Sequence, residues 1–294
     1  MNQKNYEADA KLNIQWYPGH MTKTRRQIEA DLKLVDAVCE IVDARIPMSS
    51  RNPDIDAICG SKPRIIILNR MDLADPEATK RWAAYFRSKG MAVVITDCKT
   101  RKGINDFVPA ARSVLKEKLE RDAARGMNRP VKVMVVGIPN VGKSTLINQI
   151  SGRKGAKAEN RPGVTRGKQW VTVDSSLLLL DTPGILWPKF EDPTVGLKLA
   201  FTGAVKEDVI DGEELSTRLM ELLREFDPQV VRDRYGVEPE QDVSAYDLLE
   251  QAGKKRGYLM SGGVVTTERM AKVLLDEYRA GKLGRLTFEE PEEV

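Results

Sequence analysis

Gly137, Gly142, Lys143 and Ser144 have the types and the spacing of a site that holds phosphate groups. They form a G-x-x-x-x-G-K-S pattern between the apolar run 131–136, which is a predicted strand, and a predicted helix. The glycines allow a tight turn whose N–H groups face phosphate oxygens, and the start of the helix adds a positive dipole end. The alternative is a glycine turn with an unrelated lysine, which the flanking strand and helix disfavour. We expect nucleotide contacts from Asn140, Val141, Gly142, Lys143, Ser144 and Thr145.

A magnesium ion accompanies the phosphates in loops of this kind, and three residues have the position and chemistry to hold it. The first is the hydroxyl of Ser144. Asp181 ends a predicted strand in an Asp-Thr-Pro-Gly segment and can hold Mg²⁺ through water, while the N–H of Gly184 can contact the γ-phosphate. Thr165 lies between the phosphate-loop helix and a predicted hairpin, where a switch threonine would complete the metal shell.

Asn69 and Asp72 form an Asn-x-x-Asp pattern at the end of another predicted strand. A carboxylate at Asp72 can accept hydrogen bonds from guanine N1–H and the exocyclic amine, which adenine does not offer in that arrangement. Asn69 is expected to tie the nucleotide loops together. After the next strand, the backbone of Cys98 and Lys99 is expected to face guanine O6.

Two positions depart from the usual guanine-binding patterns. Arg70 stands where lysine is usual; it keeps the charge and could still cover the base, although the two side chains are not equivalent. Asp97 replaces a serine, and its carboxylate cannot donate a hydrogen bond as a hydroxyl would. Both departures bear on affinity more than on the choice of base.

The elements that must position these residues are strands alternating with helices, which is the pattern of an α/β fold with a mostly parallel sheet. We predict strands at 37–42, 64–68, 92–96 and 131–136, a hairpin at 169–173 and 177–180, and helices at 76–89 and 104–125. The expected sheet has six strands. From about residue 195 only helical periodicity is present, so we expect an α/β domain over 1–190 and a small all-α domain over 195–294.

The motifs occur in an unusual order, because the guanine pattern precedes the phosphate loop and no asparagine follows Asn160 to supply another. The first domain is therefore predicted to be a circularly permuted Ras-like P-loop GTPase domain. Such a permutation is tolerated because the ends of a domain often lie close together on its surface.

Charge is distributed unevenly along the chain. Residues 1–190 contain 33 Lys and Arg against 20 Asp and Glu, whereas residues 191–294 contain 14 against 23. The first part thus has the charge of a polyanion-binding protein. Its basic segments, 153–168 and 112–129, can equally be solvated faces.

Other features predict a cytoplasmic protein. Three cysteines without C-x-x-C spacing indicate neither a disulfide framework nor a zinc site. No apolar run approaches the ~20 residues of a membrane helix, and the first nineteen residues fit neither a secretory signal nor a transit peptide.

The order of the motifs, together with segments 16–21, 43–47 and 181–190, resembles that of the bacterial ribosome biogenesis GTPase A family over nearly the whole chain. The resemblance implies a GTPase required for late assembly of the large (50S) ribosomal subunit. Such a protein docks on the immature subunit and its rRNA, hydrolyses GTP when the ribosome stimulates it, and is then released. DNA and membranes are not expected partners, and a monomer is expected.

Ile185 occupies the position where many GTPases have the glutamine that orients the attacking water, and it has no polar atom to do so. The resemblance assigns this catalytic role to His20, the only histidine in the chain. A structural or RNA-facing role for His20 is the alternative. That role would fit an alternative hypothesis, in which the protein is a GTP-dependent RNA- or ribosome-binding scaffold with little turnover of its own.

Asn140 and the acidic helical domain leave two further questions open. In related GTPases an asparagine at the Asn140 position binds K⁺ beside the β–γ bridge, although it could also bond only within its loop. The resemblance makes the helical domain an RNA-contacting one. Its negative charge restricts the expected contacts to islands such as Lys254–Arg256 and the end near Lys282 and Arg285.

Overall fold

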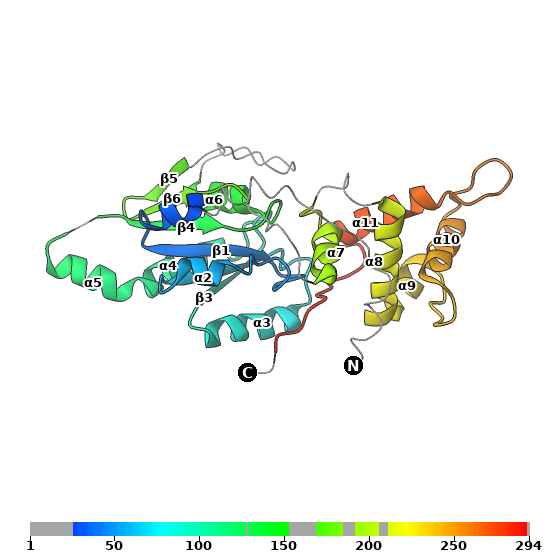
Figure 1. The fold of residues 1–294 in the computed structure, drawn as a ribbon, viewed down its shortest axis with the longest axis horizontal. Helices are drawn as coiled ribbons and strands as arrows, with labels where there is room; N and C mark the ends of the chain where they lie inside the picture. Colours follow the sequence, from blue (N-terminus) through cyan, green and yellow to red (C-terminus); the bar gives the residue numbers. More distant parts are fainter. Residues whose placement is uncertain (1–25, 128, 153–168, 185–191, 206–210, 293–294) are drawn as a thin grey trace. The chain divides into compact units, whose positions relative to one another are not determined.

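The computed structural model describes residues 26–127, 129–152, 169–184, 192–205 and 211–292. These residues belong to two compact units (Figure 1). One unit contains the described residues up to 184 together with 286–292, and the other contains those from 192 to 285. We call them the sheet unit and the helical unit.

The sheet unit contains the predicted six-stranded sheet. Its strands are β1 (Ala37–Asp43), β2 (Arg64–Asn69), β3 (Ala92–Thr96), β4 (Val131–Val136), β5 (Gln169–Asp174) and β6 (Leu177–Asp181). Their order across the sheet is β3-β2-β1-β4-β6-β5, and every neighbouring pair is parallel except β5 and β6. The central strands are buried on both faces, which explains their continuous runs of Val, Ile and Leu.

The helices of the sheet unit are the segment 26–32, α2 (Ile55–Cys59), α3 (Pro76–Ser88), η2 (Ile104–Asp106), α4 (Phe107–Val114), α5 (Lys116–Ala124) and α6 (Lys143–Ser151). Strand order runs outward from β1 to β3 and then reverses to β4. Right-handed connections therefore place α2 and α3 on one face of the sheet and α4 and α6 on the other. The reversal between β1 and β4 is a switch point, where α/β sheets bind ligands beyond the strand ends.

The predicted helix 104–125 is not continuous. It divides at Leu115, whose backbone leaves the α-helical conformation (φ −107°, ψ 9°) and whose side chain is buried. Beyond Leu115, α5 has only Leu119 as a large apolar side chain, so no apolar stripe holds this helix in line with α4. The sequence prediction was wrong here because it followed helical propensity through the end of the apolar pattern.

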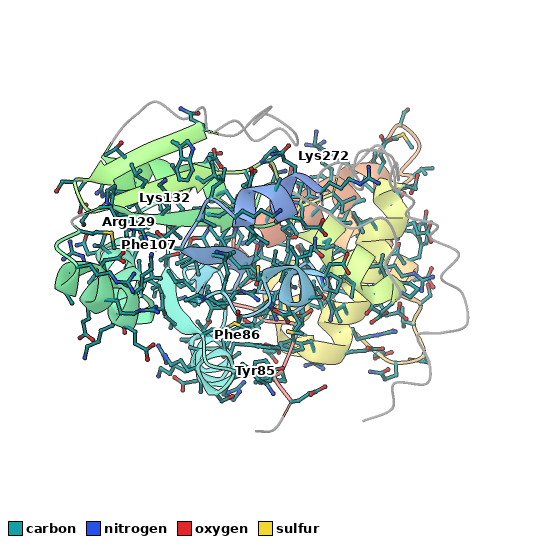
Figure 2. The ribbon with its side chains drawn as sticks, turned by 60° about the vertical axis from the view of Figure 1, so that its left-hand side comes forward. Tyr85, Phe86, Phe107, Arg129, Lys132 and Lys272 are labelled. Carbon is teal, nitrogen blue, oxygen red and sulfur yellow. The ribbon has the colours of Figure 1, made fainter. Side chains whose placement is uncertain are left out.

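Helix α3 is held by an aromatic cluster. Trp82 and Phe86 are buried against Val42, Ile66 and Leu68 on β1 and β2. The rings of Trp82 and Phe86 stack with their centroids 5.7 Å apart, and Tyr85 meets Phe86 edge to face. Figure 2 labels Tyr85 and Phe86 on this helix. Full burial of each large apolar side chain contributes about 1.5–3 kcal/mol, so this cluster fixes the position of α3 on the sheet.

The helical unit consists of α7 (Pro193–Phe201), α8 (Gly212–Phe226), α9 (Pro228–Tyr235), α10 (Ala245–Lys255) and α11 (Thr267–Arg279). The side chains of Asp192, Asp211, Asp227 and Ser244 cap four of these helices by accepting hydrogen bonds from N–H groups of the first turn. Buried leucines of α8, α10 and α11 form its core, as their helical spacing predicts.

The expected helical domain over 195–294 differs from the helical unit at its end. Residues 286–292 pack in the sheet unit, where Leu286, Thr287 and Phe288 are buried. No helical periodicity marks these residues, and their backbone pairs with loops more than two hundred positions upstream. In the described part of the chain, no helix combines the length and the apolar character needed to cross a membrane.

Candidate functional site

The phosphate loop connects β4 to α6, as its motif predicts. Gly142 begins α6 in the left-handed region (φ 109°), and its carbonyl accepts the first helical hydrogen bond, from the N–H of Leu146 at 2.8 Å. A Cβ at this glycine would lie 2.4 Å from Nδ2 of Asn69. Both the backbone conformation and the close approach therefore require glycine at this position.

Lys143 lies buried beneath the loop. Its Nζ donates to the carbonyl oxygens of Gly137 (3.2 Å) and Ile138 (3.1 Å). Burial lowers the pKa of Lys143 to about 8, and the nearby Asp181 carboxylate opposes this shift. Gly184 approaches closely as well, since a Cβ there would lie 3.0 Å from Nζ of Lys143. The lysine and the Asp-Thr-Pro-Gly segment thus meet at the loop.

Asp181 has the chemistry expected of a magnesium-site residue. It ends β6 with 3% of its surface exposed, and burial raises its pKa while Lys143 lowers it. Its Oδ1 atom is buried and has no hydrogen-bond partner within the described residues. The next residue, Thr182, is fixed by a hydrogen bond to the carbonyl of Val135 at 2.7 Å. A buried carboxylate oxygen held beside the phosphate loop fits a hard cation or its bound water.

Asn69 ties three loops together, as predicted. Its Nδ2 donates to the carbonyl of Val141 in the phosphate loop at 2.7 Å. Its Oδ1 accepts from the N–H of Cys98 at 3.1 Å and from the hydroxyl of Thr96 at 3.2 Å. One buried amide therefore fixes the guanine-pattern loop, the phosphate loop and the loop after β3 relative to one another.

Arg70 makes a second link to the phosphate loop. Its Nη2 donates to the carbonyl of Asn140 at 2.8 Å, and its Nε lies 3.5 Å from the carboxylate of Asp43. Both Arg70 (φ 64°) and Asn140 (φ 58°) have left-handed backbones. The sequence suggested that Arg70 could cover the base, but it did not reveal this bond between loops.

Asp43 and Arg45 form a buried ion pair behind Arg70. The guanidinium Nε and Nη2 atoms of Arg45 donate to the two carboxylate oxygens of Asp43 at 3.0 and 2.8 Å. Burial raises the pKa of Asp43, but the charges of Arg45 and Arg70 and the hydrogen bonds from Arg45 bring it below its usual value. The segment 43–47 stood out in the sequence, yet only the structure connects it to the guanine-pattern loop.

The loop after β3 is organised by Asp97. Its Oδ1 accepts from the N–H of Lys99 at 2.8 Å, and its Oδ2 accepts from the hydroxyl of Thr100. The carboxylate therefore shapes the loop internally by accepting hydrogen bonds, and it supplies no donor in place of the missing hydroxyl. Cys98 is buried, and burial raises the pKa of its thiol to about 11. Asp72 and Lys99 are both exposed at the surface.

Two predicted site residues, His20 and Thr165, lie outside the described residues, as do Ile185 and the basic segment 153–168. In the second basic segment, several charges are paired. Lys118 lies 3.3 Å from Asp36, Arg129 lies 3.1 Å from Asp122, and Arg112 donates to Ser176. These pairings fit the solvated-face interpretation of that segment.

Comparisons with known proteins decide the family. A family model described as a 50S ribosome-binding GTPase matches residues 132–229. Ribosome biogenesis GTPase A of Priestia megaterium is 46% identical to this chain over 287 residues, which cover 96% of this chain and 99% of the relative. The chain belongs to the ribosome biogenesis GTPase A family. The family predicted from the motifs is confirmed.

Other relatives agree in both sequence and fold. Ribosome biogenesis GTPase A of Thermotoga maritima is 34% identical over 96% of each chain. The crystal structure of GNP-bound YlqF from T. maritima matches with a TM-score of 0.63 and 31% identity, covering 92% of this chain and 100% of that chain. The predicted fold, a circularly permuted P-loop GTPase domain with a mostly parallel six-stranded sheet and added helices, is confirmed. Like GTPases in general, the family uses Mg²⁺ with GTP.

Proposed function

We propose that this GTPase acts late in assembly of the large ribosomal subunit. It binds GTP, docks on the precursor subunit and its rRNA, hydrolyses GTP when the subunit stimulates it, and is then released. The names of its relatives and the 50S ribosome-binding family model support the ribosomal partner. The proposal places the protein in the cytoplasm as a monomer, without DNA or membrane partners.

The observation that carries the guanine-nucleotide site is the set of hydrogen bonds made by Asn69. It holds the Asn-x-x-Asp loop beside the phosphate loop, which is the arrangement a single nucleotide needs to contact both. In this proposal Asp72 reads guanine, the Cys98 and Lys99 backbone faces O6, and Arg70 positions Asn140. Lys143 and the loop backbone bind the phosphates.

In this proposal Ser144, Thr165 and Asp181 would hold Mg²⁺, Asp181 through water. Mg²⁺ neutralises charge on the phosphate oxygens when it is bound. The buried Oδ1 of Asp181 supports this assignment. Asn140 is the proposed K⁺ ligand, and its left-handed backbone, held by Arg70, supports a fixed position for its side chain.

His20 is the proposed residue that orients the attacking water, because Ile185 has no polar atom for that task. We expect His20→Ala to bind GTP with wild-type affinity and to lose the stimulation by large subunits. The measurement is phosphate release with and without purified large subunits, in K⁺ and in Na⁺ buffers. If large subunits still stimulate turnover in His20→Ala, His20 is not the residue that orients the water. If the wild-type protein hydrolyses GTP equally fast in K⁺ and in Na⁺ buffer, Asn140 does not hold a K⁺ ion needed for hydrolysis.

The same measurement separates the enzyme from the alternative, a GTP-dependent scaffold. A scaffold would bind large subunits in the GTP state but show little turnover even when they are present. Depletion of the protein in cells, followed by sedimentation of extracts, tests the assembly role. Accumulated large-subunit precursors are the expected result, and a normal subunit profile would contradict the role.

A further inference from the structure

Residues 286–289 cross two loops of the sheet unit and bind both of them. The N–H of Leu286 donates to the carbonyl of Leu73 at 3.1 Å, and the N–H of Phe288 donates to the carbonyl of Arg45 at 2.9 Å. Leu73 belongs to the loop that follows β2 and the guanine pattern. Arg45 belongs to the loop that follows β1. We call residues 286–289 the strap.

Thr287 joins the two loops through one hydroxyl group. Its Oγ1 donates to the carbonyl of Ala44 at 3.2 Å and accepts from the N–H of Asp75 at 3.1 Å. The side chain is fully buried. Since a hydroxyl can donate and accept at once, this residue satisfies a polar group from each loop where water does not reach.

Glu289 binds the continuation of the first loop. Its carboxylate accepts from the N–H of Met48 at 2.7 Å, from the N–H of Ser49 at 3.2 Å and from the Ser49 hydroxyl. Its backbone carbonyl accepts from Nε1 of Trp82 on α3 at 2.9 Å. Hydrogen bonds to a charged acceptor are stronger than neutral ones, so Glu289 is the main anchor of the strap.

The two loops that the strap binds support the proposed guanine site. The first contains Asp43 and Arg45, and Asp43 lies beside Arg70. The second contains Arg70 itself, which donates to the phosphate loop at Asn140, and the exposed Asp72. None of the strap residues needs to touch the nucleotide to affect it. Their positions determine where the loops with Arg70 and Asp72 lie.

We propose that the strap is a positioning element for guanine-nucleotide binding, and that loosening it speeds nucleotide release. The proposal rests on the guanine site proposed above. Glu289 and Thr287 act through the loops at 43–51 and 69–75. The strap lies seven residues after the end of α11, so it also connects the helical unit to the guanine loops by a short covalent path.

The test compares three variants of the full-length protein. Glu289→Gln keeps the shape of the side chain but places an amide where three donors converge, and Thr287→Val removes only the bridging hydroxyl. Glu290→Gln is the matched control. The Glu290 side chain is more than half exposed and pairs with Arg81 on the surface of α3, away from both loops.

Release of a fluorescent GDP analogue is measured by stopped flow, and hydrogen exchange of segments 43–51 and 69–75 is measured without nucleotide. We expect release to be about tenfold faster in Glu289→Gln and several-fold faster in Thr287→Val, with faster exchange in both segments. Glu290→Gln should stay within about twofold of wild type, as expected for a surface pair. Wild-type release rates in both Glu289→Gln and Thr287→Val would overturn the proposal.

Two further measurements keep the interpretation clear. If Glu289→Gln folds poorly, the more conservative Thr287→Val decides, with its thermal midpoint compared with that of Glu290→Gln. Asp72→Asn should shift base preference from guanine towards xanthine, because the amide can donate to the xanthine 2-oxo group. An unchanged preference would refute the guanine site. Hydrogen exchange of segments 43–51 and 69–75 is measured without nucleotide, so it tests the effect of the strap on the loops whether or not the guanine site is correct.

Discussion

The carboxylate of Glu277 in α11 links this helix to α9 and to the end of α10. It accepts hydrogen bonds from the Arg234 guanidinium and from the Tyr235 hydroxyl at 2.9 Å, and the Arg256 guanidinium lies 3.5 Å away. Burial raises the pKa of Glu277, but these bonds and charges lower it more, so the pKa lies below its usual value. The group therefore stabilises the folded unit at pH values where the carboxylate is charged.

We predict that Glu277→Gln will weaken the acid dependence of stability. A depressed carboxyl pKa contributes stability that is complete above its ordinary value of about 4.3 and is lost as the pH falls below it. The variant should have a lower urea midpoint than wild type at pH 7, and the difference should stay constant down to about pH 5 and then shrink as the pH falls to about 3. Circular dichroism is the measurement. Glu250→Gln, an exposed position on α10, is the control. A constant difference across this range would contradict the prediction.

Single residues also show where sequence reasoning ends. The role of Asn69 follows from its motif, because an amide has both a donor and an acceptor to offer neighbouring loops. The contacts of Arg70 and Asp97 do not follow. Whether a guanidinium covers a base or bonds a carbonyl depends on loops far away in the sequence. Arg256, expected in an RNA-contacting island, instead lies over the Tyr235 ring and donates to the carbonyl of Arg234.

Among the secondary-structure elements, the start of α6 is in close contact with the loop that carries Asn69, and this contact leaves no room for a side chain at Gly142. We predict that Gly142→Ala will reduce GTP affinity at least about a hundredfold, because the new methyl group would displace the Asn69 amide and strain a left-handed backbone. Titration with a fluorescent GTP analogue measures the loss.

Gly152→Ala at the other end of α6 is the matched control. This glycine is also left-handed (φ 65°), but nothing lies within 4 Å of the position where a Cβ would be. It should cost about 1 kcal/mol of stability and leave affinity close to wild type. Equal affinities in the two variants would mean that the contact with Asn69 is unimportant.

Most strands and helices could be predicted from the sequence, since apolar runs and capping residues act over a few positions. The strand 92–96 has the predicted bounds, and α3 ends within one residue of its prediction. The division of the helix at Leu115 was missed. Propensity favours a continuous helix there, but Leu115 is buried and no apolar stripe continues beyond it.

At the scale of the whole molecule, the excess positive charge lies in residues 1–190, while residues 191–294 are acidic. Within the 254–256 island, Lys254 and Lys255 are exposed at the end of α10, whereas Arg256 contacts Glu277 and Tyr235 within the unit. The two lysines are therefore available to a polyanion, whereas Arg256 stabilises the fold of the helical unit.

We predict that Lys254→Gln with Lys255→Gln will weaken binding to large ribosomal subunits. The slope of log affinity against log salt concentration should become shallower by roughly 1 to 2, because each phosphate contact that is lost reduces the number of counterions released on binding. Sedimentation with subunits at several salt concentrations is the measurement. The same change at Lys80 and Lys89, exposed on and just after α3, is the control. An unchanged slope in the Lys254/Lys255 variant would exclude this island from the contact.

The phosphate loop, the Asn-x-x-Asp pattern, their permuted order and most of the strands can be predicted from the amino-acid sequence, because these depend on residue types within a few positions. The contacts that join these loops depend instead on how the whole chain folds. Asn69 bonds a residue 72 positions away, and Thr287 bonds one 243 positions away. The motif of Asn69 indicates that it links loops, but no local pattern identifies its partner residue, and none marks Thr287 at all. They form where the ends of β1, β2 and β4 meet, because the folded sheet brings those loops to one edge.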